Sequence, residues 1–226
     1  MTTEKPLLVS FTICPFAHRT AIVLRLKNRP YFYESIDLQN KPQWFLNEVP
    51  TGKVPALFVA TDSGQDVIFE SAIINEFLDE SFPQPLAAAT PLARAKERSW
   101  IAYSEQLILQ QFNLMCAQDK QTFDELLVAL VENLSKLKPA VGEPYFDGVR
   151  FGLVDAALAP LFYRLKWLPR VKLAIRDQAR HSDGAQRLFT WMETLADSPV
   201  VREALPQGHD QAFVDFFMAK DSYALV

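Results

Sequence analysis

The chain has 226 residues, of which 49% are hydrophobic and 22% charged, and its formal net charge is −4. This length suits one large globular domain or two small ones. The negative charge disfavours nucleic acid and anionic membranes as general partners. The sequence shows neither an apolar run that could cross a bilayer nor the pattern of a secretion signal, so we expect a cytoplasmic protein.

The cysteines and histidines are few and scattered. Cys14 and Cys116 are too few for a disulfide scaffold. His18, His181 and His209 lie far apart, and no cysteine or histidine has the spacing of zinc ligands. The sequence therefore predicts neither a disulfide framework nor a metal centre.

The first 80 or so residues alternate between strand-like and helix-like patterns. Short apolar or β-branched runs predict strands, and apolar residues three and four positions apart predict helices. We expect strands over 7–13, 31–38, 56–60 and 67–69, and helices over 16–27 and 71–81. The order is βαβ, an irregular segment, then ββα. The hairpin over 58–68 is expected to be exposed and able to meet a partner's helices.

The proline-rich stretch 83–91 predicts a linker, because proline disfavours a continued helix. Beyond it the strand pattern disappears and apolar residues recur at helical spacing. We expect helices over 92–118, 123–137, 153–165 and 186–196. The second domain, 92–226, is therefore predicted to be entirely helical.

Cys14 lies where the first strand is expected to end and the first helix to begin. Pro15 suits the first helical position, since its missing N–H would be unpaired there in any case. A sulfur at this point faces free backbone N–H groups and the positive end of the helix dipole, and both favour the thiolate. We therefore expect a lowered pKa and a nucleophilic sulfur at Cys14.

The surroundings of Cys14 in the sequence predict a monothiol. A redox dithiol has its second cysteine three residues on, where this chain has Ala17. An external small thiol is then needed to resolve a mixed disulfide. The alternative, an inert buried cysteine, is common among lone cysteines, but the strand–Cys-Pro–helix context favours the reactive one.

Two further segments fit a site for a thiol peptide. Val54-Pro55 precedes a predicted strand, and a cis bond there, which composition alone does not favour, would expose the Val54 backbone to an extended ligand. Glu70-Ser71 lies where a strand meets a helix, so Ser71 can receive a ligand carboxylate and Glu70 can pair with a ligand ammonium. A simple helix-capping role for Ser71 is compatible with this one.

Several motifs together resemble the cytosolic glutathione transferases, and in particular the omega class and its bacterial relatives. They are Cys14-Pro15-Phe16-Ala17-His18-Arg19, Asn40-Lys41-Pro42-Gln43-Trp44-Phe45, Gly52-Lys53-Val54-Pro55, Phe69-Glu70-Ser71-Ala72-Ile73 and, more weakly, Phe151-Gly152-Leu153-Val154-Asp155-Ala156. The resemblance implies a thioredoxin-like, glutathione-binding domain over 1–82 and a helical domain over 92–226 that supplies most of the electrophile pocket. It also implies a homodimer.

The resemblance assigns roles to individual residues. Cys14 would be the catalytic thiolate, with Phe16 lining the sulfur site. Lys41 would contact the glycine carboxylate of glutathione, Val54 would pair its backbone with the cysteinyl part ahead of a cis Pro55, and Glu70 and Ser71 would hold the γ-glutamyl group. No metal site is implied.

Three positions stay open at this stage. Gly152 stands where the family usually has Ser or Thr at a helix cap. Asp155 can still accept a hydrogen bond from the N–H of the capping residue, which is the other half of a capping box. His18 stands where the omega class often has Glu or Gln; it is either near the sulfur or a partly exposed helix residue, and the latter is the simpler expectation. Cys116 is expected in the core, with the mouth of the substrate pocket as its alternative.

The function expected from these features is glutathione-dependent thiol transfer or reduction, including reduction of dehydroascorbate, with conjugation at most a side activity. A non-enzymatic alternative comes from a second resemblance. Stringent-starvation proteins share this fold, bind RNA polymerase, and have helices similar to Glu70–Glu80 and a segment similar to Phe82-Pro83-Gln84-Pro85. They lack the reactive cysteine, so Cys14 separates the two functions. Chloride-channel-like relatives are a third possibility, which the absence of a membrane-suited first helix disfavours.

Overall fold

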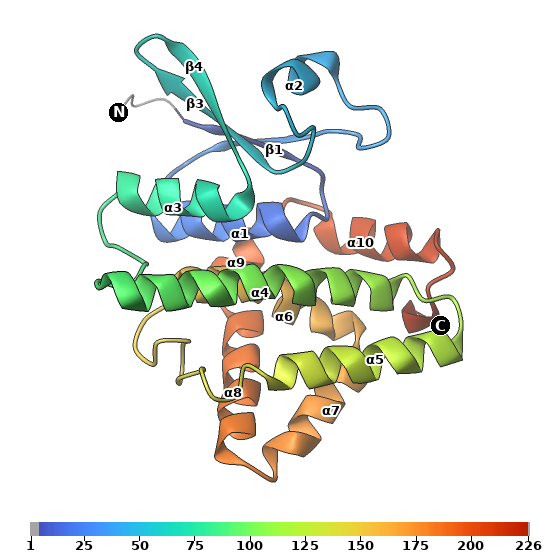
Figure 1. Cartoon of the computed structure of the whole chain (residues 1–226). Coiled ribbons are helices and arrows are strands. Elements are labelled where there is room, and N and C mark those ends of the chain that lie inside the picture. Colours follow the sequence, from blue (N-terminus) through green and yellow to red (C-terminus); the bar gives the residue numbers. More distant parts are fainter. Residues whose placement is uncertain (1–4, 226) are drawn as a thin grey trace.

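A computed structural model of the chain describes residues 5–225 (Figure 1). The strands β1 (Leu7–Ser10), β2 (Phe32–Ser35), β3 (Ala56–Thr61) and β4 (Gly64–Phe69) form one sheet in the order β2-β1-β3-β4. β1 and β2 are parallel, while the pairs β1–β3 and β3–β4 are antiparallel. The sheet and its helices confirm the expected thioredoxin-like arrangement.

The two faces of the sheet are covered by different helices (Figure 1). These are α1 (Pro15–Leu26) and α3 (Ser71–Ser81) on one face, and the short α2 (Gln43–Glu48) beside the other. Side chains alternate accordingly, as strand geometry requires. Leu8 and Leu57 join the large core with the helices, whereas Val9 and Phe58 pack in a small cluster with Phe45 of α2.

The sequence-based boundaries hold for helices better than for strands. The helix expected over 71–81 has those bounds, and the one expected over 16–27 runs from Pro15 to Leu26. The strand expected over 7–13 ends at Ser10, because Cys14 N–H donates to the Phe11 carbonyl at 3.0 Å and closes a turn. The strand expected over 31–38 is limited to Phe32–Ser35, which is the part that pairs with β1.

The second half is helical. It contains α4 (Pro91–Met115), α5 (Lys120–Ser135), α6 (Leu153–Arg164), α7 (Pro169–Ala179), α8 (Asp183–Asp197), α9 (Pro199–Glu203) and α10 (His209–Met218), with short 3-10 turns η1 (Leu165–Trp167) and η2 (Tyr223–Leu225). α6 lies in the middle of the helices, and its residues from Leu153 to Phe162 are all buried. A helix that is apolar on every side is expected in such a position.

A buried ion pair joins α1 and α3 to the segment 82–90 that leads into α4. Lys27 Nζ lies 2.7 Å from Asp79 Oδ1, and the two side chains are 0% and 5% exposed. The Asp79 carboxylate also accepts the N–H groups of Leu86 and Ala87 at 2.6 and 3.0 Å. The carboxylate therefore holds the end of α3, the end of α1 and the connecting segment together.

The N-terminus of α6 has the hydrogen bond from the capping residue to Asp155 that the sequence predicts, and the surrounding structure shows why the capping residue is a glycine. Asp155 Oδ2 accepts the Gly152 N–H at 2.7 Å, while Oδ1 accepts Phe146 N–H at 2.9 Å and Trp191 Nε1–H at 2.6 Å. A Cβ at position 152 would lie 3.1 Å from the Leu86 carbonyl oxygen. Glycine therefore allows the close approach of the connecting segment, which a serine or threonine cap would crowd.

Candidate active site

The pairing of the strands brings the predicted site segments to one edge of the sheet. Ala56 pairs with Val9 of β1 on one side and with Phe69 of β4 on the other. Consequently the loop after β1, the residues before β3 and the residues after β4 meet at this edge. These segments carry Cys14, Val54-Pro55 and Glu70-Ser71.

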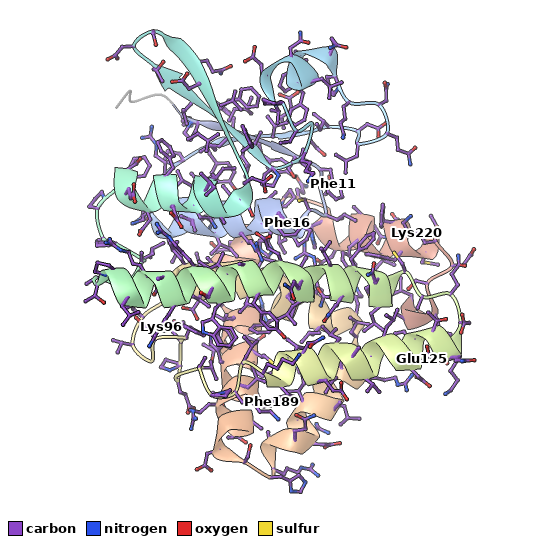
Figure 2. The ribbon with its side chains drawn as sticks, in the orientation of Figure 1. Phe11, Phe16, Lys96, Glu125, Phe189 and Lys220 are labelled. Carbon is purple, nitrogen blue, oxygen red and sulfur yellow. The ribbon has the colours of Figure 1, made fainter. Side chains whose placement is uncertain are left out.

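Cys14 is the N-cap residue of α1, as the sequence predicts. Its Sγ accepts the Ala17 N–H at 3.4 Å, and Pro15 occupies the first helical position. The side chain is only 4% exposed. Phe16 is half-buried on the first turn of α1, and Figure 2 shows Phe11 and Phe16 near this end of α1, between the sheet and the helical half.

The pKa expected for Cys14 requires a correction. Burial raises the pKa of this thiol above its ordinary value, because an ion loses hydration inside the protein. The Ser10 hydroxyl, the N–H groups of Ala17 and Phe16, and the charge of Arg164 all act to lower it. The helix start thus contributes in the predicted direction, but for the sulfur as it lies here burial outweighs it.

Glu70 has an unusual backbone conformation at the start of α3. Its φ of 66° and ψ of 114° lie in a region that residues other than glycine rarely adopt. Such conformations concentrate at ligand sites, where surrounding structure maintains them. The Glu70 side chain is exposed, whereas Ser71, the first residue of α3, is 5% exposed.

Lys41 and Val54 lie on the segment between β2 and β3. Both side chains are half-buried, and the Val54–Pro55 peptide bond is cis, as the resemblance implies. Lys41 Nζ lies 4.0 Å from the point that a Cβ on Gly52 would occupy. Lys41 is therefore next to the loop that leads into Val54, although the chain separates them by more than ten residues.

A buried polar cluster next to the segment that carries Cys14 was not predicted from the sequence. His18 is 3% exposed, so the expectation of a partly exposed helix residue is wrong. It contacts Arg164 of α6, and its Nε2 lies 2.7 Å from the carbonyl oxygen of Val201 in α9. Arg164 and His209 are each 3% exposed and belong to the same cluster. Arg164 ends a helix that is mostly apolar, and a charged residue in such a helix could have indicated a polar contact inside the core.

Two other expectations concern more distant residues. Cys116 is the C-cap of α4 and is only partly buried, and burial raises the pKa of its thiol while the charge of Lys220 opposes this. The hairpin expected to be exposed buries Phe58, which is 3% exposed, against α2. Its β4 strand is the exposed part.

Within residues 5–225 the structure has neither a candidate metal site nor a membrane-spanning helix. No three His, Cys, Asp or Glu side chains in this part of the chain converge in a way that could hold a metal ion. None of the helices described there combines the length and apolarity needed to cross a bilayer.

Comparison with known proteins gives the family. Residues 13–81 match the family described as "Glutathione S-transferase, N-terminal domain". The pyrimidodiazepine synthase of Drosophila melanogaster is 31% identical over 208 residues, covering 91% of this chain and 82% of that protein. The chain belongs to the glutathione transferase family, and it is omega-like.

Two further similar proteins differ in the function that their names give. The crystal structure of glutathione transferase Omega 3C from Trametes versicolor superimposes with a TM-score of 0.72, at 28% identity and over 90% of both chains. A stringent starvation protein A homolog of Haemophilus influenzae is 37% identical over 158 residues, covering 68% of this chain and 71% of that protein. Relatives of this glutathione transferase therefore carry names from more than one functional class.

Proposed function

We propose that this glutathione transferase is a thiol transferase that uses Cys14 as its nucleophile and glutathione as its cosubstrate. The observation that carries the proposal is the position of the Cys14 sulfur at the start of α1, where it accepts the Ala17 N–H at the sheet edge shared with Val54 and Glu70. Because position 17 is an alanine, the chain has no neighbouring thiol to form an internal disulfide.

The reaction proceeds in two thiol–disulfide exchanges. The Cys14 thiolate attacks the glutathionyl sulfur of a mixed disulfide, the S–S bond breaks, and the substrate leaves as a thiolate that takes up a proton. A second glutathione thiolate then attacks the glutathionyl sulfur on Cys14, which releases oxidised glutathione and restores the Cys14 thiolate. One disulfide is consumed and one is formed, so no further oxidant or reductant is required.

Glutathione would lie along the sheet edge beside Cys14. Free N–H groups at the start of α3 suit the γ-glutamyl carboxylate near Ser71, and the exposed Glu70 carboxylate suits its ammonium. The backbone of Val54 would pair with the cysteinyl part, the Lys41 ammonium with the glycine carboxylate, and Phe16 would line the sulfur. The second substrate would be a small disulfide or dehydroascorbate.

Two features of the assembly belong to the same proposal. The helical domain, 92–226, would supply most of the pocket for the second substrate, and two copies of the chain would form a homodimer. Conjugation of glutathione to electrophiles would be slow, because that reaction favours a hydroxyl that stabilises the bound thiolate, whereas a cysteine tends to form a disulfide with it.

Steady-state reduction of a glutathionylated peptide by glutathione tests the proposal. Cys14→Ala should lose the activity, and the matched variant Cys116→Ser should keep it, because Cys116 is the C-cap of α4 and its sulfur has no helix N-terminus to favour the thiolate. Cys14→Ser should also lose reduction and can gain some conjugation. Full reductase activity in Cys14→Ala would contradict the proposal.

The 37% identity to a stringent starvation protein A homolog supports a second candidate, a binding role without catalysis. On this candidate the chain would bind RNA polymerase, as the sequence resemblance suggests, and Cys14 would be an inert residue, in keeping with its 4% exposure. Equilibrium binding of the purified polymerase, unchanged in Cys14→Ala, together with an absence of thiol transfer would favour this role.

A further inference from the structure

Arg164 carries a buried positive charge next to the segment that precedes Cys14. It is the last residue of α6 and is 3% exposed. Its guanidinium donates to the carbonyl oxygens of Pro160 at 2.9 Å and Ile13 at 3.1 Å, and contacts His18 Nδ1 at 3.2 Å and His209 Nε2 at 3.0 Å. Within residues 5–225 no carboxylate oxygen lies within 4.0 Å of it.

The hydrogen bonds of Arg164 determine the protonation of both histidines. A guanidinium only donates, so the ring nitrogens that face it must accept. His18 therefore donates from Nε2 to the Val201 carbonyl, and His209 donates from Nδ1 to the Asp210 carboxylate at 2.9 Å. Burial lowers the pKa of both histidines, that of His209 to about 4, so at neutral pH they are uncharged and leave the charge on Arg164.

Arg19 of α1 is a second buried cation in the same region. It is 1% exposed and donates to the Ala157 carbonyl at 2.8 Å and to Ser104 Oγ at 2.6 Å. The one carboxylate within 4.0 Å of it among the described residues is that of Glu105, at 3.9 Å, and its side chain is 46% exposed. Two buried guanidiniums thus lie near Cys14 with little negative charge to balance them, which is costly unless an anion forms nearby.

We infer that Arg164 is a positioning residue for the reaction of Cys14: its charge stabilises the Cys14 thiolate, and its bond to the Ile13 carbonyl fixes the residue before the sulfur. The inference rests on the proposed function only for the reaction in which the thiolate is used, since the Arg164 charge and its hydrogen bond are present whatever the substrate. Burial lowers the pKa of Arg164 and of Arg19 to about 10, and the charge of an ionised Cys14 acts in the opposite direction on both. The helical half thereby completes a site whose ligand contacts lie in the first half.

Other charged and titratable groups interact with Cys14 or with Arg164 and affect the balance of charge between them. They are Tyr33 on β2, His18 and Arg19 on α1, Tyr163 on α6, and His209 and Asp210 on α10. Asp210 is the carboxylate among them, but it accepts from His209, Tyr163 and Lys166. It is therefore already paired, and Cys14 is the group left to balance Arg164.

The pH profile of Cys14 alkylation tests this inference without glutathione. In a Cys116→Ser background, so that one thiol reacts, Arg164→Met should raise the pKa of Cys14 and lower the thiolate fraction at neutral pH severalfold, because the Arg164 charge is one of several groups that lower this pKa. Arg164→Lys, which keeps the charge, should shift the pKa less. The matched control Arg170→Met removes an exposed arginine of α7 that pairs with Asp124, and should leave the profile unchanged.

An unchanged profile in folded Arg164→Met would overturn the inference, whereas a failure of glutathione to react with wild-type Cys14 would overturn only the proposed function. If Arg164→Met does not fold, Arg164→Gln replaces it, since an amide keeps a donor for the Ile13 carbonyl but removes the charge. Arg164→Gln should raise the pKa of Cys14 in the same way. An unchanged profile in Arg164→Gln would reject the role of the Arg164 charge.

Discussion

The Arg164 guanidinium donates a hydrogen bond of 3.1 Å to the carbonyl oxygen of Ile13, and so joins the end of α6 to the residue before Cys14. Two residues separated by about 150 positions in the chain thus meet behind the proposed nucleophile. The ligand contacts proposed for glutathione come from other segments, which meet at the sheet edge. Each part of this arrangement can be tested separately.

The start of α3 gives a test of glutathione binding. Ser71→Ala and Glu70→Ala should each weaken the affinity for glutathione roughly tenfold, since a hydrogen bond to a charged group contributes about 1.5 kcal/mol. Isothermal titration calorimetry with a glutathione analogue that lacks the thiol measures the affinity without disulfide exchange. Asp66→Ala on the exposed part of β4 serves as the control. Unchanged affinity in both variants would remove Glu70 and Ser71 from the site.

His209 should make the folded state sensitive to acid. Because burial lowers the pKa of His209 from 6.5 to about 4, the unfolded chain binds a proton in this interval that the folded chain does not. Stability should therefore fall as the pH drops from about 6.5 towards 4, by up to about 3 kcal/mol from this residue. Denaturant unfolding should show a smaller loss in His209→Gln than in wild type.

The exposed His181 provides the control for that experiment. His181→Gln should keep the pH dependence of the wild-type chain. If His209→Gln and His181→Gln behave alike, His209 titrates in the folded protein as it does in water. An uncharged His209 that accepts a hydrogen bond from Arg164 is then the wrong assignment.

Asp155 should be among the most sensitive positions for stability. Its carboxylate accepts three hydrogen bonds, so Asp155→Ala would leave the N–H groups of Gly152, Phe146 and Trp191 without that partner. We expect a loss of roughly 3 kcal/mol or more in the free energy of unfolding, and a loss of about 1 kcal/mol for Trp191→Phe beyond any change in packing. The exposed Asp177→Ala should be nearly neutral. A small effect of Asp155→Ala would show that water replaces the carboxylate.

Much of this fold follows from local patterns, and the departures have definite causes. The helix over Ser71–Ser81 has the predicted bounds because its apolar stripe and its flanking residues are all local. α2 was missed because its six residues have no side-chain cap and no long stripe. The strand over Phe32–Ser35 is shorter than predicted because it pairs only with β1, at the edge of the sheet.

Some features of the candidate site could be predicted from the sequence and others could not. Cys14 at the start of a helix could be predicted, since Pro15 and the preceding apolar run define that point in the sequence. The burial that raises its pKa could not, and neither could the cluster of Arg164, His18 and His209, because 146 residues separate His18 from Arg164. Contacts of this range depend on how α1 and α6 pack together.

The oligomeric state should be a homodimer, which the family resemblance implies. Sedimentation equilibrium should give a species of twice the 25.7 kDa chain mass at micromolar concentration. A single species at the mass of one chain would contradict the dimer. It would leave the proposal for Cys14 in place, because neither thiol–disulfide exchange uses a residue of a second copy.

Mass spectrometry of the intact protein after incubation with oxidised glutathione is the most direct test of Cys14 as the nucleophile. We expect one added glutathionyl group, located on Cys14 by peptide mapping, absent from Cys14→Ala, and removed by reduced glutathione. Cys116 should remain unmodified, because it lacks a helix N-terminus and a buried cation to stabilise its thiolate. An unmodified Cys14, or a glutathionyl group on Cys116 alone, would show that Cys14 is not the nucleophile.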